Sequence, residues 1–283
     1  MGSRTATDLL HRVLGCYRDL HAHPEIAGEE ARTAGVLAAG LAESGLEVTT
    51  GVGGHGVVGV LRNGPGPVVL LRAELDALPI SERTGLSFAC ASKENRMHAC
   101  GHDAHLATLL GAVELLSGSR NRWQGTVIAV GQPAEETLTG AAAMLADGLY
   151  SRFPRPDVAL AQHLAPLPAG VLAHSDGSIT ITGAIVSLRL HGRGGHAGMP
   201  GLAENPISTA AAILTALERL PDTVGTTVTC CSIRAGEAAN VIPELAELTL
   251  SVRAPDCGRL DAAIAAVTDL AVQVAGAVRV DVR

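Results

Sequence analysis

The sequence is poor in aromatic side chains and has no cluster of positive charge. Phe, Tyr and Trp make up 2% of the 283 residues, and 21 Lys and Arg face 28 Asp and Glu, for a formal net charge of -7. With so few aromatic rings, a stacking platform for bases or sugars is not expected. Without clustered Lys and Arg, binding to nucleic acid or to an anionic membrane surface is not expected either. A small or neutral ligand remains open.

Long apolar runs are also missing. No run approaches the roughly 20 residues that cross a bilayer, and the N-terminus lacks the apolar core of a signal peptide. Ala6 stands where N-myristoylation requires Ser or Thr. We therefore expect a soluble cytoplasmic protein whose six cysteines are reduced, with the adjacent Cys230 and Cys231 in a buried strand.

Small aliphatic residues are plentiful, at 47% hydrophobic residues and 33 glycines, and the length allows two domains. In the first part of the chain, apolar periodicity predicts helices over residues 8–21, 29–43, 104–117 and 140–147. Runs of β-branched residues predict strands over 48–50, 56–61, 68–72, 125–130 and 158–162. This alternation predicts an α/β domain with a substantially parallel, buried sheet.

The pattern changes after about residue 178. Strands are predicted over 185–191, 226–233, 246–252 and 278–282, with helices over 206–220 and 260–275. The order β-α-β-β-α-β is that of a ferredoxin-like sandwich. We place the boundary near residues 178–183, which predicts one domain over 1–180 and another over 181–283.

The segment Met97–His105 holds three imidazoles, a thiol and a carboxylate within nine residues. In an extended segment Cys100 and His102 would point to the same side, and Gly101 would let the backbone bend so that both reach one ion. Thiolate and imidazole ligands favour Zn or a neighbouring first-row ion over Mg or Ca. The alternative is a buried Cys beside a helix-capping Asp103, with histidines that face solvent.

Three further stretches place polar side chains at the ends of predicted strands, where α/β sheets bind their ligands. Each alone is also what a solvated loop or a satisfied polar residue would look like. Together with the first segment, they indicate a site. The side chains are the carboxylates of Glu74, Asp76, Glu135 and Glu136 and the imidazole of His163.

Seven stretches, in order along the chain, resemble the successive signatures of the M20 metallopeptidase family. The branch is the amidohydrolase group that includes hippurate hydrolase, N-acyl amino acid deacylases and auxin-conjugate hydrolases. The resemblance implies a zinc-peptidase-like α/β catalytic domain with an inserted ferredoxin-like lid and dimerisation domain, and hence a homodimer. The stretches are His21–Glu25, Arg72–Pro79, Met97–His105, Gly131–Glu136, Gln162–His163, Gly194–Ala197 and Asn240–Pro243.

The resemblance also implies two divalent metal ions, with Zn or Mn as first candidates and Co or Ni as alternatives. The residues that resemble the metal ligands of the family are Cys100, His102, Glu136 and His163. Two ions that share the Cys100 sulfur would deprotonate its thiol. They would also bring the pKa of a shared water near neutrality.

Three more residues receive roles from the same resemblance. Glu135 resembles the general base, and His196 resembles a lid histidine that stabilises the oxyanion in the partner subunit's site. Asp76 would support the metal cluster. Without the resemblance, the alternative for His196 is a polar residue of a Gly-rich loop. Asn240, which resembles a lid residue near the substrate, could instead stabilise a turn.

Two features depart from the family pattern. Glu74 stands where the branch usually has Asp, one methylene shorter. The family's chain also continues past the lid to a last metal-binding histidine, whereas this sequence ends at Arg283. A truncated fragment, an early end of the reading frame and a second chain that supplies the rest remain open explanations.

The expected function is therefore a metal-dependent amidohydrolase that cleaves N-acyl amino acids or similar small amides. The alternative is a catalytically inactive, truncated homologue that binds metal and dimerises. A redox protein that uses Cys100 is a weaker hypothesis, because no second cysteine lies in a resolving position.

Overall fold

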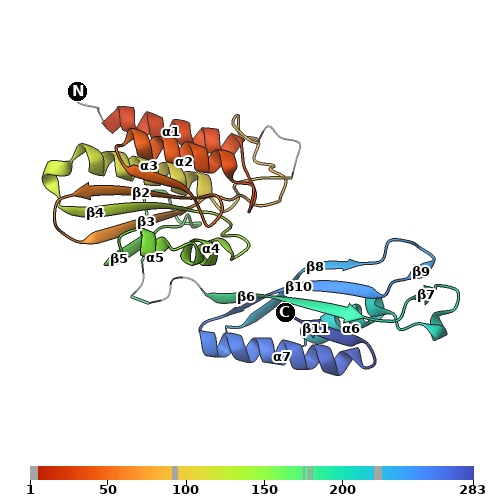
Figure 1. Cartoon of the computed structure of the whole chain (residues 1–283). Coiled ribbons are helices and arrows are strands. Elements are labelled where there is room, and N and C mark those ends of the chain that lie inside the picture. Colours follow the sequence, from red (N-terminus) through yellow and green to blue (C-terminus); the bar gives the residue numbers. More distant parts are fainter. Residues whose placement is uncertain (1–5, 91–94, 175, 178, 180, 220–224) are drawn as a thin grey trace. The chain divides into compact units, whose positions relative to one another are not determined.

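The computed structural model describes residues 6–90, 95–174, 176–177, 179, 181–219 and 225–283. It divides into two compact units, Met1–Ala169 and Gly170–Arg283 (Figure 1). The functional division into a catalytic domain (1–180) and a lid (181–283) stays a prediction. Ser178 and Thr180 of the expected boundary, Leu220 of the helix predicted over 206–220, and Met1–Thr5 lie outside the described residues.

The first unit is built on a mixed five-stranded sheet. β3 pairs in parallel with β4 and β5, whereas β2 pairs antiparallel with β1 and β4. The prediction of a substantially parallel sheet is therefore wrong for the β1–β2 half, because the short turn between those strands permits only antiparallel pairing. The order is β1 (Glu47–Val52), β2 (Gly56–Asn63), β4 (Gly125–Gln132), β3 (Val68–Glu74) and β5 (Val158–Ala161).

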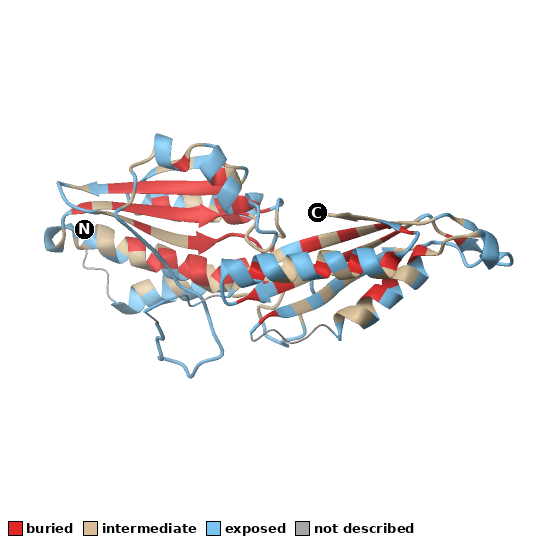
Figure 2. Ribbon diagram, turned by 90° about the horizontal axis from the view of Figure 1, so that it is seen from below, coloured by how far each residue is buried: buried red, intermediate tan, exposed pale blue. Residues whose placement is uncertain are grey.

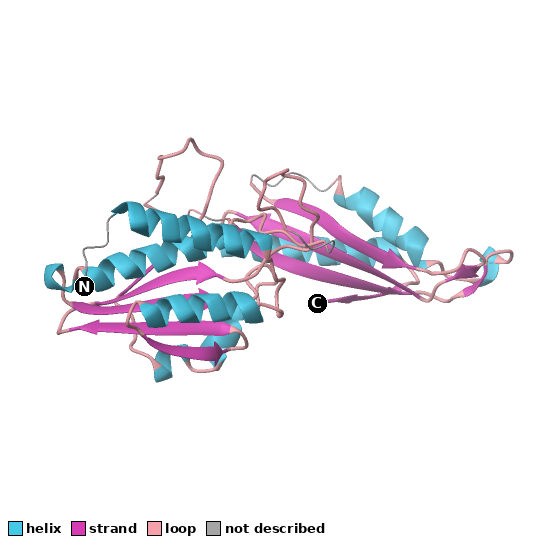
Figure 3. Ribbon diagram, turned by 90° about the horizontal axis from the view of Figure 1, so that it is seen from above, coloured by secondary structure: helices cyan, strands magenta, loops and turns pink. Residues whose placement is uncertain are grey.

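Helices cover both faces of this sheet (Figures 1 and 3). Along β2, Val57 and Leu61 enter the core shared with α2 and α3, whereas Val58 and Val60 enter the core that contains Met144 of α4. β2 and β4 are consequently buried along most of their length (Figure 2). The helices are α1 (Ala6–Ala22), α2 (Ala31–Glu43), α3 (His102–Gly118), the short η1 (Arg120–Arg122), α4 (Gly140–Ala146) and α5 (Leu149–Arg152).

The edge strand β5 departs from the expected burial. All four of its residues are exposed, with Val158 at 49% and Leu160 at 53%. Within the part of the chain that the structure describes, β5 has a strand neighbour on one side only, β3. The sheet is therefore buried at its centre and open at this edge.

The second unit has the predicted order β-α-β-β-α-β. Its antiparallel sheet runs β11–β6–β10–β8, and Val186, Leu188 and Leu190 of β6 alternate into a core shared with α6 and α7. Cys230 of β8 is half-buried and Cys231 is exposed, so the expectation of a buried pair is wrong: β8 lies at the sheet edge. The elements are β6 (Thr182–His191), α6 (Pro206–Leu217), β8 (Thr227–Ala235), β10 (Leu245–Ala254), α7 (Cys257–Ala275) and β11 (Arg279–Val282).

A small two-stranded sheet joins two distant stretches of the second unit. β7 (Gly195–His196) pairs antiparallel with β9 (Val241–Ile242), and the Ala197 amide donates to the Asn240 carbonyl at 3.0 Å. The short η2 (Pro200–Leu202) follows β7. Across the described residues of both units, none of the helices combines the length and apolar character that crossing a membrane requires.

Candidate metal centre and active site

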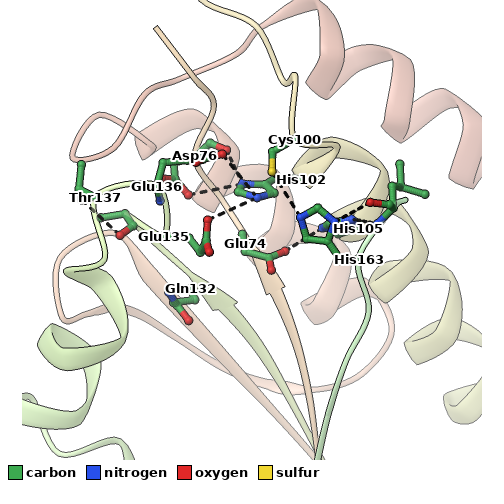
Figure 4. Close-up of polar contacts among 12 residues, drawn as sticks. Glu74, Asp76, Cys100, His102, His105, Gln132, Glu135, Glu136, Thr137 and His163 are labelled. Atoms are coloured by element: carbon green, nitrogen blue, oxygen red, sulfur yellow. Dashed lines mark hydrogen bonds and ion pairs between the residues drawn. The ribbon is translucent and has the colours of Figure 1, made fainter. Parts of the chain in front are cut away.

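The candidate site lies where three parallel strands end. β3 pairs with β4 so that Glu74 faces Gln132, and with β5 so that Arg72 faces Ala161. Because parallel strands end at the same edge of a sheet, the segments that follow them come out together. Six of the seven predicted site residues meet there, five of them around His102 (Figure 4): Asp76, Cys100, Glu135, Glu136 and His163.

The start of α3 positions two of these side chains. Gly101 adopts a left-handed conformation (φ 81°) immediately before the helix, and a Cβ at this position would lie 2.8 Å from the Leu164 side chain. Only glycine combines that φ with that approach at low cost. Cys100 therefore lies in a turn and His102 in the first helical turn, so the expectation of an extended Cys100–His102 segment is wrong. The tight bend at Gly101 is present.

His102 is fully buried and is oriented by a backbone contact. Its Nδ1 donates to the Asp76 carbonyl oxygen at 2.7 Å, which in the neutral ring leaves a lone pair on Nε2. Nε2 lies 3.8 Å from a Glu135 oxygen and 3.9 Å from Glu136 Oε1. Neither His102 Nε2 nor Glu136 Oε1 has a hydrogen-bond partner within the described chain. Two buried acceptors that face each other suit a cation.

Cys100 and His163 complete a second group with His102. Cys100 Sγ lies 3.3 Å from His163 Nε2, and the ligand atoms of all three residues lie within 4.8 Å of one another. His102, Glu135 and Glu136 form another such group, so His102 belongs to both. A pocket of about 660 Å³, walled by α1, α3 and residues 163–166, opens beside Cys100 and His163.

The electrostatics of the site favour a bound cation. Burial raises the pKa of Cys100 to about 12, and the charge of Glu136 adds to this effect. Burial and the charge of Glu135 also raise the pKa of Glu136, against the opposing effect of His102. A divalent cation would lower both pKa values. The combination of thiol, imidazole and carboxylate is one that Zn and neighbouring ions bind, so these residues fit the expected metal.

Asp76 holds two members of the site in place. Its Oδ2 accepts from the Glu136 amide at 2.9 Å, while its carbonyl oxygen holds His102. Burial alone would raise the pKa of Asp76, but the His102 imidazole, whose Nδ1 lies 3.6 Å from Asp76 Oδ1, and hydrogen bonds from backbone amides lower it overall. Asp76 is therefore an ionised anchor behind the site.

The segment between β4 and α4 carries Glu135 and Glu136 in a constrained backbone. Ala134 and Leu138 have positive φ values of 48° and 58°, and a Cβ at Gly140 would lie 1.6 Å from the Pro133 carbonyl oxygen. The fully buried Glu30 accepts from the Ala134 amide at 2.8 Å. Two buried carboxylates, Glu30 and Asp76, thus hold the amides on either side of Glu135.

Sequence reasoning missed Glu30 and His105 as parts of the site. His105 donates to Glu74 at 2.8 Å, and both side chains are 2% exposed. Burial alone would raise the pKa of Glu74, but the hydrogen bond from His105 and the charge of Arg72 lower it overall. For His105 the sequence offered a signal in its spacing from His102, because residues three apart on a helix share a face.

His196 is the predicted site residue that the first unit does not contain. It is exposed in β7 of the second unit, and its Nδ1 accepts from the Gly198 amide at 3.0 Å. Its catalytic role therefore stays a prediction, as do the roles assigned to the other six residues.

The comparison with protein families decides the relationship. A model described as peptidase family M20/M25/M40 matches residues 70–279, which include all four candidate metal ligands. The chain belongs to this family. The M20 resemblance and the α/β fold class predicted from the sequence are thereby confirmed.

Two curated relatives cover most of the chain. Hippurate hydrolase of Campylobacter jejuni is 38% identical over 245 residues, 84% of this chain and 63% of the relative. N-acetylcysteine deacetylase of Bacillus subtilis is 34% identical over 254 residues, 86% of this chain and 65% of the relative. The chain thus spans a little less than two thirds of the length of these M20 relatives.

Two solved structures are similar to this chain over nearly its whole length. A Bacillus subtilis protein described as a dinuclear metal-binding peptidase of the M20 family is 28% identical, with a TM-score of 0.74 over 99% of this chain and 74% of that one. A protein from methicillin-resistant Staphylococcus aureus is 31% identical, with a TM-score of 0.76 over 96% of this chain and 74% of the other.

Proposed function

We propose that this M20 chain carries the catalytic centre of a metal-dependent amidohydrolase that cleaves N-acyl amino acids or similar small amides. The observation that carries the proposal is the pair of buried, unpartnered acceptors, His102 Nε2 and Glu136 Oε1, beside Cys100 and His163. The names of the two curated relatives support the substrate class, since hippurate and N-acetylcysteine are both N-acyl amino acids.

In this proposal four side chains hold two divalent ions: Cys100, His102, Glu136 and His163. Zn or Mn are the first candidates, and Co or Ni are alternatives, because such a mixed ligand set accepts several first-row ions. When bound, the ions supply Lewis acidity, which polarises an amide carbonyl and lowers the pKa of water toward neutrality.

Glu135 is the general base of the proposal. Its side chain is 33% exposed and its carboxylate lies 3.8 Å from His102 Nε2, so it borders the group while remaining open to water and substrate. It accepts the proton of the attacking water and delivers it to the departing amine. Adjacent side chains diverge, which lets Glu136 bind metal while Glu135 moves the proton.

Three further parts of the proposal concern the surroundings of the site. Asp76 orients His102 and the Glu136 amide, and His196 of the second unit stabilises the oxyanion in the partner subunit's site. The second unit serves as the lid and as the surface of a homodimer. The cytoplasmic location expected from the sequence remains a prediction.

The decisive experiment measures hydrolysis of a panel of N-acyl amino acids with added Mn or Zn, for the wild type and for Glu135→Gln. Loss of a general base typically costs about 10²- to 10⁴-fold in rate, so turnover should fall by that factor. Bound metal, measured by elemental analysis, should stay at the wild-type level because the substitution leaves all four proposed ligands in place.

Glu43→Gln is the matched control, since Glu43 is an exposed carboxylate at the end of α2. It should retain wild-type turnover. Wild-type activity in Glu135→Gln would contradict the role of Glu135. A wild-type chain that binds metal without turnover of any panel member would favour the inactive, metal-binding homologue.

A further inference from the structure

A continuous path of polar contacts, buried at Glu74 and His105, lies behind His163. Arg72 pairs with one oxygen of Glu74, and the other oxygen accepts from His105 Nδ1 at 2.8 Å. On the far side of the ring, His105 Nε2 accepts from the Leu164 amide at 2.9 Å. The path therefore runs from the end of β3, through α3, to the residue next to a candidate metal ligand.

These contacts define the proton positions of His105. A backbone N–H can only donate, so His105 Nε2 carries a lone pair and Nδ1 carries the proton that Glu74 accepts. Both ring nitrogens are thus engaged. Although the ligand atoms of Glu74, His102 and His105 lie within 4.8 Å of one another, His105 has no nitrogen left for a metal ion.

Leu164 is held through both of its backbone polar groups. Its N–H meets His105, and its carbonyl oxygen accepts from His163 Nδ1 at 2.6 Å. With Nδ1 used in this way, His163 Nε2 is the nitrogen that faces Cys100 Sγ at 3.3 Å. The hydrogen bond of His105 thus fixes the backbone of Leu164, the residue whose carbonyl oxygen anchors the His163 ring.

The segment that carries His163 lies on the surface of the first unit. Residues 157–174 are all exposed, and β5 is an edge strand. His105, by contrast, is 2% exposed on the long helix α3. The His105–Leu164 contact therefore ties an exposed segment to a buried imidazole whose two ring nitrogens are both hydrogen-bonded.

We infer that His105 is a positioning residue that holds the His163 imidazole toward Cys100, with Glu74 fixing the orientation of His105. The inference rests on the proposed function, because it assigns the support of one ligand of that metal site. Partners behind a metal ligand typically change metal affinity by about 10- to 100-fold when they are removed.

The test is a double-mutant cycle on zinc affinity, measured by competition with a chromogenic chelator. His105→Phe keeps a ring in the core but removes both hydrogen bonds, and should weaken zinc binding about 10- to 100-fold. In the His163→Ala background the same substitution should have no further effect, because the ligand it positions is gone. His11→Phe, at an exposed histidine of α1, is the control and should match the wild type.

Two outcomes would overturn the inference. Unchanged affinity in His105→Phe would show that His163 does not depend on His105. An equal loss in both backgrounds would show that His105 acts on the metal directly or on the fold as a whole.

A second readout separates this inference from the proposed function. Hydrogen exchange of the Leu164 amide in metal-free protein should accelerate in His105→Phe, whether or not the chain binds zinc. If the wild type binds no zinc, the proposed function fails, and the exchange rate alone decides: faster exchange supports the role of His105, and unchanged exchange refutes it.

If circular dichroism shows that His105→Phe does not fold, Glu74→Ala carries the test. This substitution removes the acceptor of the Nδ1 hydrogen bond and leaves the imidazole in place. Zinc affinity should fall in the wild-type background and stay constant in the His163→Ala background, and unchanged affinity in both would overturn the inference.

Discussion

Cys16 and Cys100 lie in different surroundings, which give their thiols different chemistry. Burial raises the pKa of Cys16 to about 11, and the charge of Asp19 adds to it. Cys16 packs against the apolar core beneath α2 and α3, away from the candidate ligands. Cys100 lies in one candidate ligand group with His102 and His163, and a bound cation would favour its thiolate. Of these two thiols, Cys100 is therefore the one suited to metal.

This contrast predicts the alkylation pattern of the thiols. With a pKa raised from 9.0 to about 11, Cys16 holds about 100-fold less thiolate at pH 8 than a free thiol does. Its reaction with iodoacetamide should be slower by a similar factor and should rise about tenfold per pH unit up to pH 11. Mass spectrometry checks this, with the exposed Cys231 and Cys257 as internal references. Equal rates at pH 8 would contradict the prediction.

At the residue scale, the sequence predicts side chains that carry chemistry better than those that support them. Cys100 and His102 stand out because a thiol and an imidazole two residues apart suggest metal binding. Glu30 gives no such signal, since its contact with Ala134 joins residues 104 apart in sequence. Contacts of that kind depend on how helices pack on the sheet, which local patterns do not encode.

At the element scale, the segment over residues 133–140 depends on Glu30. Glu30 stands at the N-terminus of α2, yet its side chain makes no capping bond to that helix and instead accepts from the Ala134 amide. A residue at φ 48° stays in that conformation only when its surroundings hold it. We therefore expect the order of this segment to follow the Glu30 contact.

Glu30→Ala should loosen this segment. Loss of one hydrogen bond costs about 1 kcal/mol, which corresponds to about fivefold faster amide exchange over residues 134–140, while the amides of β4 keep their protection. Glu30→Gln retains an acceptor oxygen and should behave like the wild type. Exchange in Glu30→Ala that equals the wild type would show that the segment is held by other contacts.

The predicted helices and strands agree with the structure where the apolar periodicity is long. The predictions fail for properties that depend on neighbouring elements, such as burial and strand pairing. α3 extends two residues further toward the N-terminus than predicted, because Gly101 ends the preceding turn and allows His102 into the helix. β5 matches its predicted position but not its burial, since burial depends on what lies next to an edge strand. The antiparallel pairing of β1 with β2 likewise follows from turn length more than from strand composition.

At the scale of the whole molecule, the two units have separate cores, and all candidate ligands lie in the first. A ligand that binds only folded protein stabilises the part that forms its site. Metal should therefore raise the stability of Met1–Ala169 and leave Gly170–Arg283 unchanged.

Calorimetry with zinc and with EDTA checks this expectation. At about 100 times its dissociation constant, zinc should add about 2.7 kcal/mol, which raises the midpoint of the first unit by about 5–10 °C. The transition of the second unit should not move. His102→Ala, which removes the residue shared by both ligand groups, should abolish the shift. A zinc-dependent shift of the second transition would contradict this assignment.

The sheet order of the first unit has a consequence for how the protein folds. The site joins Asp76 to Glu136 across 60 residues and His105 to Leu164 across 59, and both closures depend on β3 pairing in parallel with its neighbours. Contacts between such distant parts of a chain form slowly, because loop closure must come first. We expect helices such as α3 to form early and the cation-binding geometry to form last, so metal capture would report that the folding of this unit is complete.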